Sequence, residues 1–123
     1  MDAAEYVQKA LRTEVQEYSF SATGDVTPRI EHAIMGITTE AGELMDAVKK
    51  TKIYGKPLDI VNLLEEAGDT MWYLAILADA LGVSFEEIWQ KNIAKLQKRY
   101  PEKFSHENAL QRDTDAERKI LES

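Results

Sequence analysis

The sequence predicts an all-α protein, and two observations lead to that class. Apolar residues recur at helical spacing along most of the 123 residues, whereas no segment shows the apolar–polar alternation of a half-buried strand. Capping and turn residues divide the chain into four long helical segments. Cysteine is absent, so neither disulfides nor thiolate metal sites shape the fold. We therefore expect a four-helix-bundle-like domain with a short additional helix near its C-terminal end.

The first two helices are separated by a polar loop. The first is expected over residues of about 3–18, and the loop that follows, about 19–27, contains Gly24. The second helix begins at Thr27-Pro28, because threonine caps a helix N-terminus and proline fits its first turn. It continues to about Lys50, where lysines suit the negative end of the helix dipole.

The remaining helices are also bounded by recognisable end signals. The third is expected over residues of about 59–81 and ends at Gly82, a residue type favoured just beyond a helix C-terminus. The fourth opens with a capping box that starts at Ser84, and it ends before Pro101. A short fifth helix is expected at Thr114, with Glu117 completing a second capping box. We expect residues 1–104 to form the domain and residues 105–123 to form an arm or tail.

The most informative motif is Glu-Ala-Gly followed by an acid, which occurs twice. The first copy provides Glu40 and Glu43 on the second helix, and the second copy provides Glu66 and Asp69 on the third. Residues three apart share one helix face, so each copy presents two carboxylates side by side. On the second helix the acids adjoin a strip of small residues where another helix can approach closely, formed by Ala33, Gly36 and Ala47.

A single acidic pair on a helix is most often a solvated surface, but this chain favours a metal site. The motif is repeated on consecutive helices, and each copy includes a mid-helix glycine, which costs about 1 kcal/mol relative to alanine. The second copy leads directly into the most apolar segment, residues 71–81, which we expect to be central and covered. Carboxylate ligands favour Mg²⁺, with Mn²⁺ as a substitute, and such sites are commonly completed by phosphate oxygens.

Basic and aromatic residues supply candidate partners for phosphate. The fourth helix carries a row at helical spacing, formed by Lys91, Asn92, Lys95, Lys98 and Arg99. This row is either a solvated helix face or, if it lies beside a metal site, a set of side chains that bind a polyphosphate. Tyr73 lies one turn beyond Asp69, so its hydroxyl could reach a phosphate or sugar, whereas we interpret His32 as an interface or core-edge residue. A further basic stretch is interpreted as a helix end and solvated turn, at Lys49, Lys50, Lys52 and Lys56.

Charge and hydropathy exclude several other classes. The formal net charge of −7 argues against binding to duplex nucleic acid or to an anionic membrane. The N-terminus is polar and acidic, unlike a signal peptide, and the longest apolar run is too short to cross a bilayer. We expect a cytoplasmic protein.

The paired motifs and their flanks resemble the MazG-like nucleoside triphosphate pyrophosphohydrolases of the all-α NTP pyrophosphatase superfamily. The resemblance covers residues of about 28–104, through Thr39–Leu44, Glu65–Leu74 and Asn92–Pro101. It implies Mg²⁺-dependent hydrolysis of a (deoxy)nucleoside triphosphate to the monophosphate and pyrophosphate. By resemblance, Mg²⁺ is held by Glu40, Glu43, Glu66 and Asp69, and the phosphates are bound by Asn92, Lys95, Arg99 and Tyr73.

The implied reaction also suggests roles and partners. Glu40 or Glu43 would orient or deprotonate the water that attacks the α-phosphorus, and Lys95 and Arg99 would stabilise the departing charge. Relatives form dimers or tetramers, so we expect a homo-oligomer. The expected role is nucleotide-pool control or house-cleaning. The alternative is a noncatalytic helical module that binds a nucleotide or a protein through its acidic face.

Overall fold

The computed structural model describes residues 1–123 and is all-helical, which confirms the predicted class. Its six helices are α1 (Ala3–Leu11), α2 (Pro28–Lys52), α3 (Ile60–Ala80), α4 (Phe85–Arg99), α5 (His106–Leu110) and α6 (Thr114–Glu122). The chain divides into two compact units, Met1–Val83 with α1 to α3 and Ser84–Ser123 with α4 to α6.

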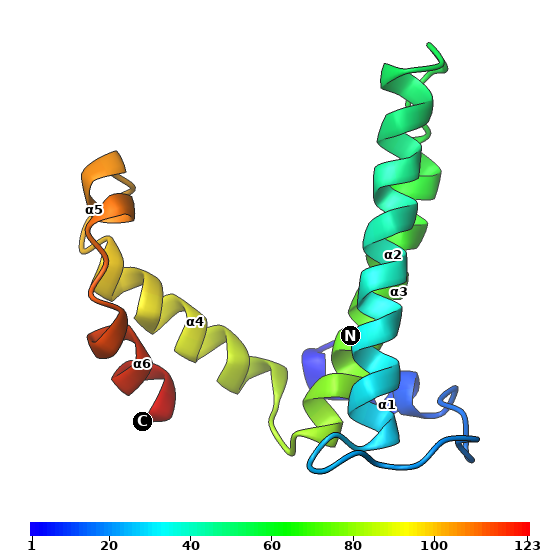
Figure 1. Ribbon diagram of the computed structural model, residues 1–123, viewed down its shortest axis with the longest axis horizontal. Coiled ribbons are helices and arrows are strands. Elements are labelled where there is room, and N and C mark those ends of the chain that lie inside the picture. The colour runs from blue at the N-terminus through cyan, green and yellow to red at the C-terminus, as the bar shows by residue number, and fades with distance from the viewer. The chain divides into compact units, whose positions relative to one another are not determined.

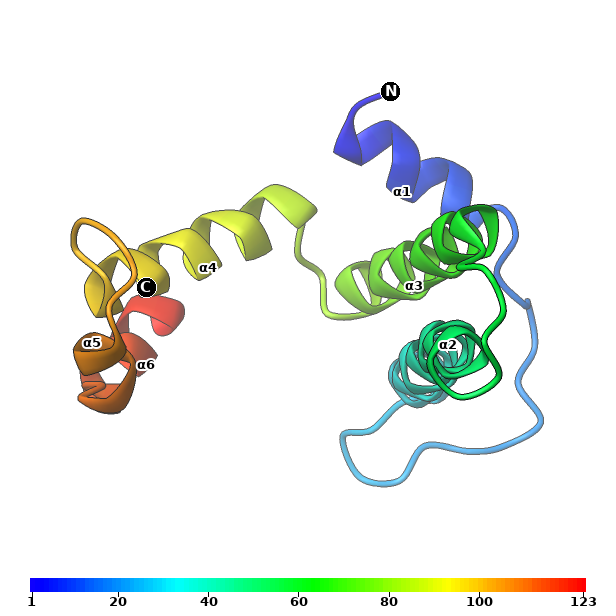
Figure 2. The ribbon, with the colours of Figure 1, turned by 90° about the horizontal axis from the view of Figure 1, so that it is seen from above.

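The first unit is built on a long antiparallel pair of helices. Figures 1 and 2 show α2 and α3 lying side by side, with α1 against α3 on the side away from α2. Small residues dominate the buried interior, which consists of Ala10, Ala33, Ala47, Ala75, Ile76 and Ala78 together with Gly36. The small-residue strip predicted on the second helix is therefore buried, and it allows the two long helices to approach closely.

The ends of α2 and α3 follow the predicted signals to within two residues. Thr27 caps α2 by accepting a hydrogen bond from the Ile30 N–H at 3.3 Å. At the same end of the pair, Gly82 adopts a positive φ of 70° after α3. The N–H groups of Gly82 and Val83 then bond to the carbonyls of Asp79 and Ala78, which is the Schellman arrangement.

Helix α1 is shorter than predicted, because it ends at Leu11 and not near residue 18. Contacts with distant residues replace the helical bonds of the following segment. Thr13 accepts a hydrogen bond from the Trp72 indole N–H at 2.7 Å, and Glu14 receives two hydrogen bonds from Arg29 at 2.8 and 2.9 Å. The prediction was wrong because these partners lie far away in the sequence.

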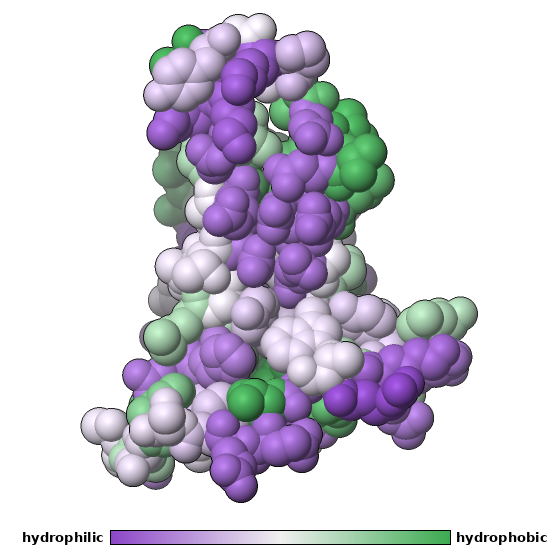
Figure 3. Space-filling view, turned by 90° about the vertical axis from the view of Figure 1, so that its right-hand side faces the viewer, coloured by the Kyte–Doolittle hydropathy of each residue, from purple (hydrophilic) through white to green (hydrophobic).

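The long helices expose many large apolar side chains. The apolar part of α3 was expected to be covered, but Met71 is 58% exposed and Leu74 is 41% exposed. Figure 3 shows a hydrophobic patch beside a hydrophilic strip, near the end where the α2–α3 loop lies. Exposed apolar residues around that end are Ile53, Leu58, Ile60, Val61 and Leu64. Burial within one chain therefore accounts for only part of the apolar pattern.

In the second unit α6 packs against α4, and the buried residue that joins them is an acid. Glu117 is 3% exposed and accepts hydrogen bonds from Arg99 at 2.8 Å and from Arg112 at 2.7 Å. Asp113 caps α6, so the predicted capping box of Thr114 and Glu117 was wrong. The short helix α5 was not predicted. The predicted boundary between a domain of residues 1–104 and a tail of residues 105–123 stays a prediction. None of the helices combines the length and the apolar character that a bilayer span requires.

Candidate metal centre

Three of the four predicted acids converge on the paired helices. Ligand oxygens of Glu40 from α2 and of Glu66 and Asp69 from α3 all lie within 4.8 Å of one another. Oxygens that share one Mg²⁺ or Ca²⁺ stand about 2.0–2.6 Å from the ion, so opposite ligands are roughly 4–5 Å apart. The side chains are thus spaced as the ligands of a hard divalent cation, and their all-oxygen chemistry suits such an ion.

The electrostatics of this acid cluster also favour a cation. A hydrogen bond with the Glu66 carboxylate, followed by burial and the charges of Glu66, Asp69 and Glu43, raises the pKa of Glu40 from 4.5 to about 7. The metal-free cluster therefore retains a proton that a fully ionised set of carboxylates would not hold. A divalent cation can replace this proton and neutralise more of the charge.

A neighbouring amide orients the buried member of the cluster. Glu66 is 9% exposed, and its Oε1 accepts a hydrogen bond from Asn62 Nδ2 at 2.9 Å. Asn62 stands one helical turn before Glu66, so both side chains lie on the same face of α3. Our sequence analysis missed Asn62, although its spacing of four residues from Glu66 was a usable signal.

Glu43 lies outside the group of three. It is exposed on α2 and lines a hollow that extends away from the cluster towards the α2–α3 loop. Its charge nevertheless contributes to the raised pKa of Glu40. The structure therefore places Glu43 next to the cluster but outside the group whose ligand oxygens lie within 4.8 Å of one another.

An aromatic group lies one helical turn beyond Asp69 on α3. The ring of Tyr73 packs directly on Gly36, where an added Cβ would stand only 2.1 Å from a ring carbon. Tyr73 also meets His32 edge-on at 5.6 Å between ring centroids, and His32 Nδ1 lies 3.3 Å from the Tyr18 hydroxyl. The interpretation of His32 as a core-edge residue agrees with these contacts.

The N-terminal helix adds one more group to this region. The charge of Asp69, second to burial, raises the pKa of Tyr6 on α1. The Tyr6 hydroxyl is therefore close enough to Asp69 for the negative charge of that residue to affect its pKa. No local pattern in the sequence indicates this proximity, because it depends on how α1 packs against α3.

The basic residues predicted on the fourth helix differ in their surroundings. Lys95 is half-buried and Asn92 is exposed, and their spacing of three places them on one face of α4. Lys91 pairs with Glu87 of the same helix at 3.0 Å. Arg99 is held by Glu117, so its guanidinium already has an anionic partner. Phosphate binding by Asn92, Lys95 and Arg99 stays a prediction.

Fold and site together define an all-helical protein whose carboxylate cluster is suited to a divalent cation. The chain belongs to the family of the MazG nucleotide pyrophosphohydrolase domain, which matches residues 29–104. It is 39% identical over 75 residues to the Gene 37 protein of Mycobacterium phage L5, an alignment that covers 57% of this chain. The aligned part spans 65% of that relative's length, and the relative's name states no activity. No solved structure matches the chain.

Proposed function

We propose that this protein hydrolyses (deoxy)nucleoside triphosphates to the monophosphate and pyrophosphate, with Mg²⁺ as its cofactor and Mn²⁺ as a substitute. The observation that carries the proposal is the convergence of Glu40, Glu66 and Asp69 on the two helices within the MazG family match. A nucleotide pyrophosphohydrolase activity is what this family suggests. The triphosphate substrate, the metal and the role in nucleotide-pool control or house-cleaning are our proposals.

The acids would have separate duties in this reaction. Glu40, Glu66 and Asp69 would hold the metal, with Glu43 as a further ligand or as the general base. When bound, a divalent cation supplies charge neutralisation and Lewis-acid assistance at the phosphates. Glu43 is the better placed base, because it stands beside the cluster and is not part of it. It would accept the proton of the water that attacks the α-phosphorus.

Other residues would position the site and the substrate. Asn62 would fix the orientation of Glu66 through its 2.9 Å hydrogen bond. Lys95 and Asn92 on α4 remain our candidates for holding phosphate oxygens. Arg99 would have to release Glu117 before its guanidinium could bind a phosphate, so we expect it to contribute less to phosphate binding than Lys95. The Tyr73 hydroxyl would lie near the phosphates or sugar.

The test is product analysis with a panel of nucleotides. The protein is incubated with each common (d)NTP and Mg²⁺, and monophosphate is separated from diphosphate. We expect monophosphate and pyrophosphate in equal amounts, with loss of turnover in Glu66→Gln and Asp69→Asn and in the presence of EDTA. Glu65→Gln is the matched control, since Glu65 is an exposed neighbour outside the cluster.

Each other outcome has a distinct meaning. Release of diphosphate and orthophosphate would point to a different phosphatase and contradict the proposal. Full activity of Asp69→Asn would contradict the assigned site. Absence of turnover with every triphosphate would instead favour the noncatalytic nucleotide- or protein-binding module.

We also propose that the protein is a homo-oligomer, a dimer or a tetramer. Large apolar residues of α2 and α3 are exposed in the single chain, including Ile34 at 50%, Met45 at 66% and Val61 at 77%. A second copy brings the same kind of surface and would cover these residues. Sedimentation equilibrium at micromolar concentration should give a multiple of the 14.0 kDa chain mass, and a monomer would contradict the proposal.

A further inference from the structure

We propose that Lys50 and Lys56 form a binding site for the pyrophosphate end of the substrate, in the hollow at the loop end of the α2–α3 pair. This inference rests on the proposed function and assigns a place to the leaving group. The sequence indicated only a helix end and a solvated turn for these lysines. The structure instead has both lysines lining one hollow beside the acid cluster.

The hollow adjoins the cluster through two of its lining residues. It has a volume of about 390 Å³ and is lined by Glu43, Asp46, Ala47, Lys50, Lys56, Pro57, Asp59 and Asn62. Glu43 and Asn62 connect the hollow to the cluster, since Glu43 follows Glu40 by three residues on α2 and Asn62 bonds to Glu66. A group bound in the hollow would therefore be next to a cation held by the three acids.

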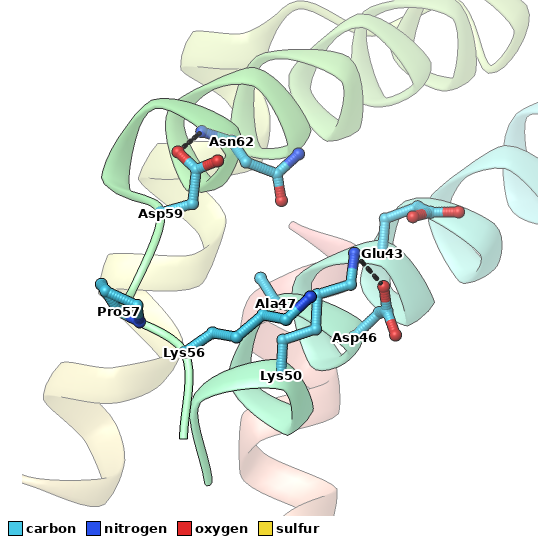
Figure 4. Close-up of a pocket in the computed structure, with 8 residues that line it drawn as sticks. All are labelled: Glu43, Asp46, Ala47, Lys50, Lys56, Pro57, Asp59 and Asn62. Atoms are coloured by element: carbon cyan, nitrogen blue, oxygen red, sulfur yellow. Dashed lines mark hydrogen bonds and ion pairs between the residues drawn. The ribbon is translucent and has the colours of Figure 1, made fainter. Parts of the chain in front are cut away.

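The backbone holds the two lysines together. The Lys56 N–H donates a hydrogen bond to the Lys50 carbonyl at 3.1 Å, and Gly55 between α2 and α3 adopts a positive φ of 66° that permits this turn. Figure 4 shows both lysine side chains extending into the hollow, one from the last turns of α2 and the other from the loop. The turn thus places two ammonium groups on the same side of the cluster.

Both ammonium groups are available to an anionic ligand. Lys56 forms no ion pair, and Lys50 pairs with Asp46 at 2.9 Å in a contact whose side chains are 55% and 40% exposed. Such an exposed pair contributes little to stability and exchanges partners readily. Asn62 offers an additional amide on the opposite wall of the hollow.

Because acids surround the two lysines, phosphate binding in the hollow would require a cation at the acid cluster. Glu43, Asp46 and Asp59 also line the hollow, so a free anion would meet more negative than positive side chains. Asp59 is occupied as the cap of α3, where it accepts a hydrogen bond from the Asn62 N–H at 3.1 Å. A divalent cation at the acid cluster reverses the local sign of charge and makes a phosphate chain the complementary ligand.

The direction of the substrate follows from the order of residues along the helices. The Tyr73 ring fills the space against Gly36 on one side of the cluster, whereas the hollow opens on the other side. Seven residues separate Glu43 from Lys50, a rise of about 10 Å along α2, and the long lysine side chain shortens this gap. The β- and γ-phosphates would therefore point towards the loop and the nucleoside away from it.

The test measures binding of inorganic pyrophosphate to the full chain by calorimetry with saturating Mg²⁺. We expect Lys50→Ala and Lys56→Ala each to weaken this binding roughly fivefold, with a larger loss in the double variant. Asp46→Asn should strengthen binding, because it releases Lys50 and removes a negative charge. Lys52→Ala is the matched control, since Lys52 is exposed at the same helix end but does not line the hollow.

The results separate this inference from the proposed function. Affinity for the nucleoside monophosphate should be unchanged in the lysine variants, and their circular dichroism should match that of the wild type. The inference is overturned if the wild type does not bind pyrophosphate, or if the two variants behave as Lys52→Ala does. An active wild type with unaffected lysine variants would reject only this site, whereas the absence of any turnover would reject the proposed function.

Discussion

Gly36 allows the closest helix contact in the first unit, and replacing it by alanine tests the packing described above. An ideal Cβ at this position lies 2.1, 2.3 and 2.3 Å from three ring carbons of Tyr73. Non-bonded carbons prefer separations of about 3.5–4.0 Å, so the ring would have to move by roughly 1.4 Å or more. Overpacking of this kind costs about 1–3 kcal/mol. The same change within a helix gains about 1 kcal/mol of helix propensity.

Two other glycines in the helices provide matched controls. A Cβ at Gly42 in α2 or at Gly68 in α3 has no heavy atom within 4 Å. Alanine at these positions should therefore gain the propensity term without the overpacking cost. The free energy of unfolding of Gly36→Ala is expected to be about 1–3 kcal/mol below that of Gly42→Ala, because the propensity terms cancel in this comparison.

The assay is urea unfolding followed by circular dichroism, in EDTA and at low protein concentration. A lower midpoint for Gly36→Ala at an unchanged m-value would report the loss of stability. In a Tyr73→Ala background the cost of Gly36→Ala should largely disappear, since the two residues are in direct contact. Equal midpoints for Gly36→Ala and Gly42→Ala would refute the proposed contact between the Tyr73 ring and Gly36.

Three further predictions concern the acids and the packing of the outer helices. The pKa of Glu40 is raised from 4.5 to about 7, so between these pH values the folded state without metal binds more protons than the unfolded state. Its free energy of unfolding should therefore fall as pH rises from about 4.5 to 7. Urea titrations of Glu40→Gln should show no such pH dependence. The pKa of Glu117 is lowered to about 2 by Arg99 and Arg112, so the α4–α6 contact should weaken as pH falls from about 4.5 towards 2. Glu117→Gln should weaken the same contact at neutral pH, which would be measured as faster amide hydrogen exchange in α6. Trp72→Phe should weaken the packing of α1 on α3 by about 1 kcal/mol, because it removes the indole N–H that bonds to the Ala10 carbonyl and the Thr13 hydroxyl. Proteolysis within α1 should therefore become faster.

Local sequence signals were sufficient for the long helices and for the face that carries the acids. The caps at Thr27 and Ser84 and the glycine at position 82 act within a few residues of the helix ends that they define. The placement of Glu40 beside Glu43, and of Glu66 beside Asp69, on one face of a helix likewise depends only on the pitch of an α-helix. At these positions one helical turn determines the geometry, and sequence analysis and structure agree.

The errors arose where a residue bonds to a partner far away in the sequence. The end of α1 depends on Glu14 and its contact with Arg29, 15 residues away, and Glu117 bonds to Arg99, 18 residues away, in place of completing a capping box. Neither partner can be read from the local pattern. The same holds for Tyr6 beside Asp69, which requires the packing of α1 on α3.

The amino-acid sequence by itself determined the all-helical class, the limits of α2, α3 and α4, and the pairing of carboxylates on two helices, because these properties depend on spacing along a single helix. Only the tertiary structure decided which carboxylates meet, with Glu43 left outside the group of three, and that Lys50 and Lys56 face one hollow. These outcomes depend on how closely α2 and α3 approach and on how the loop between them turns. Both are set by contacts between residues from different helices, and such contacts are not encoded in the spacing along either one.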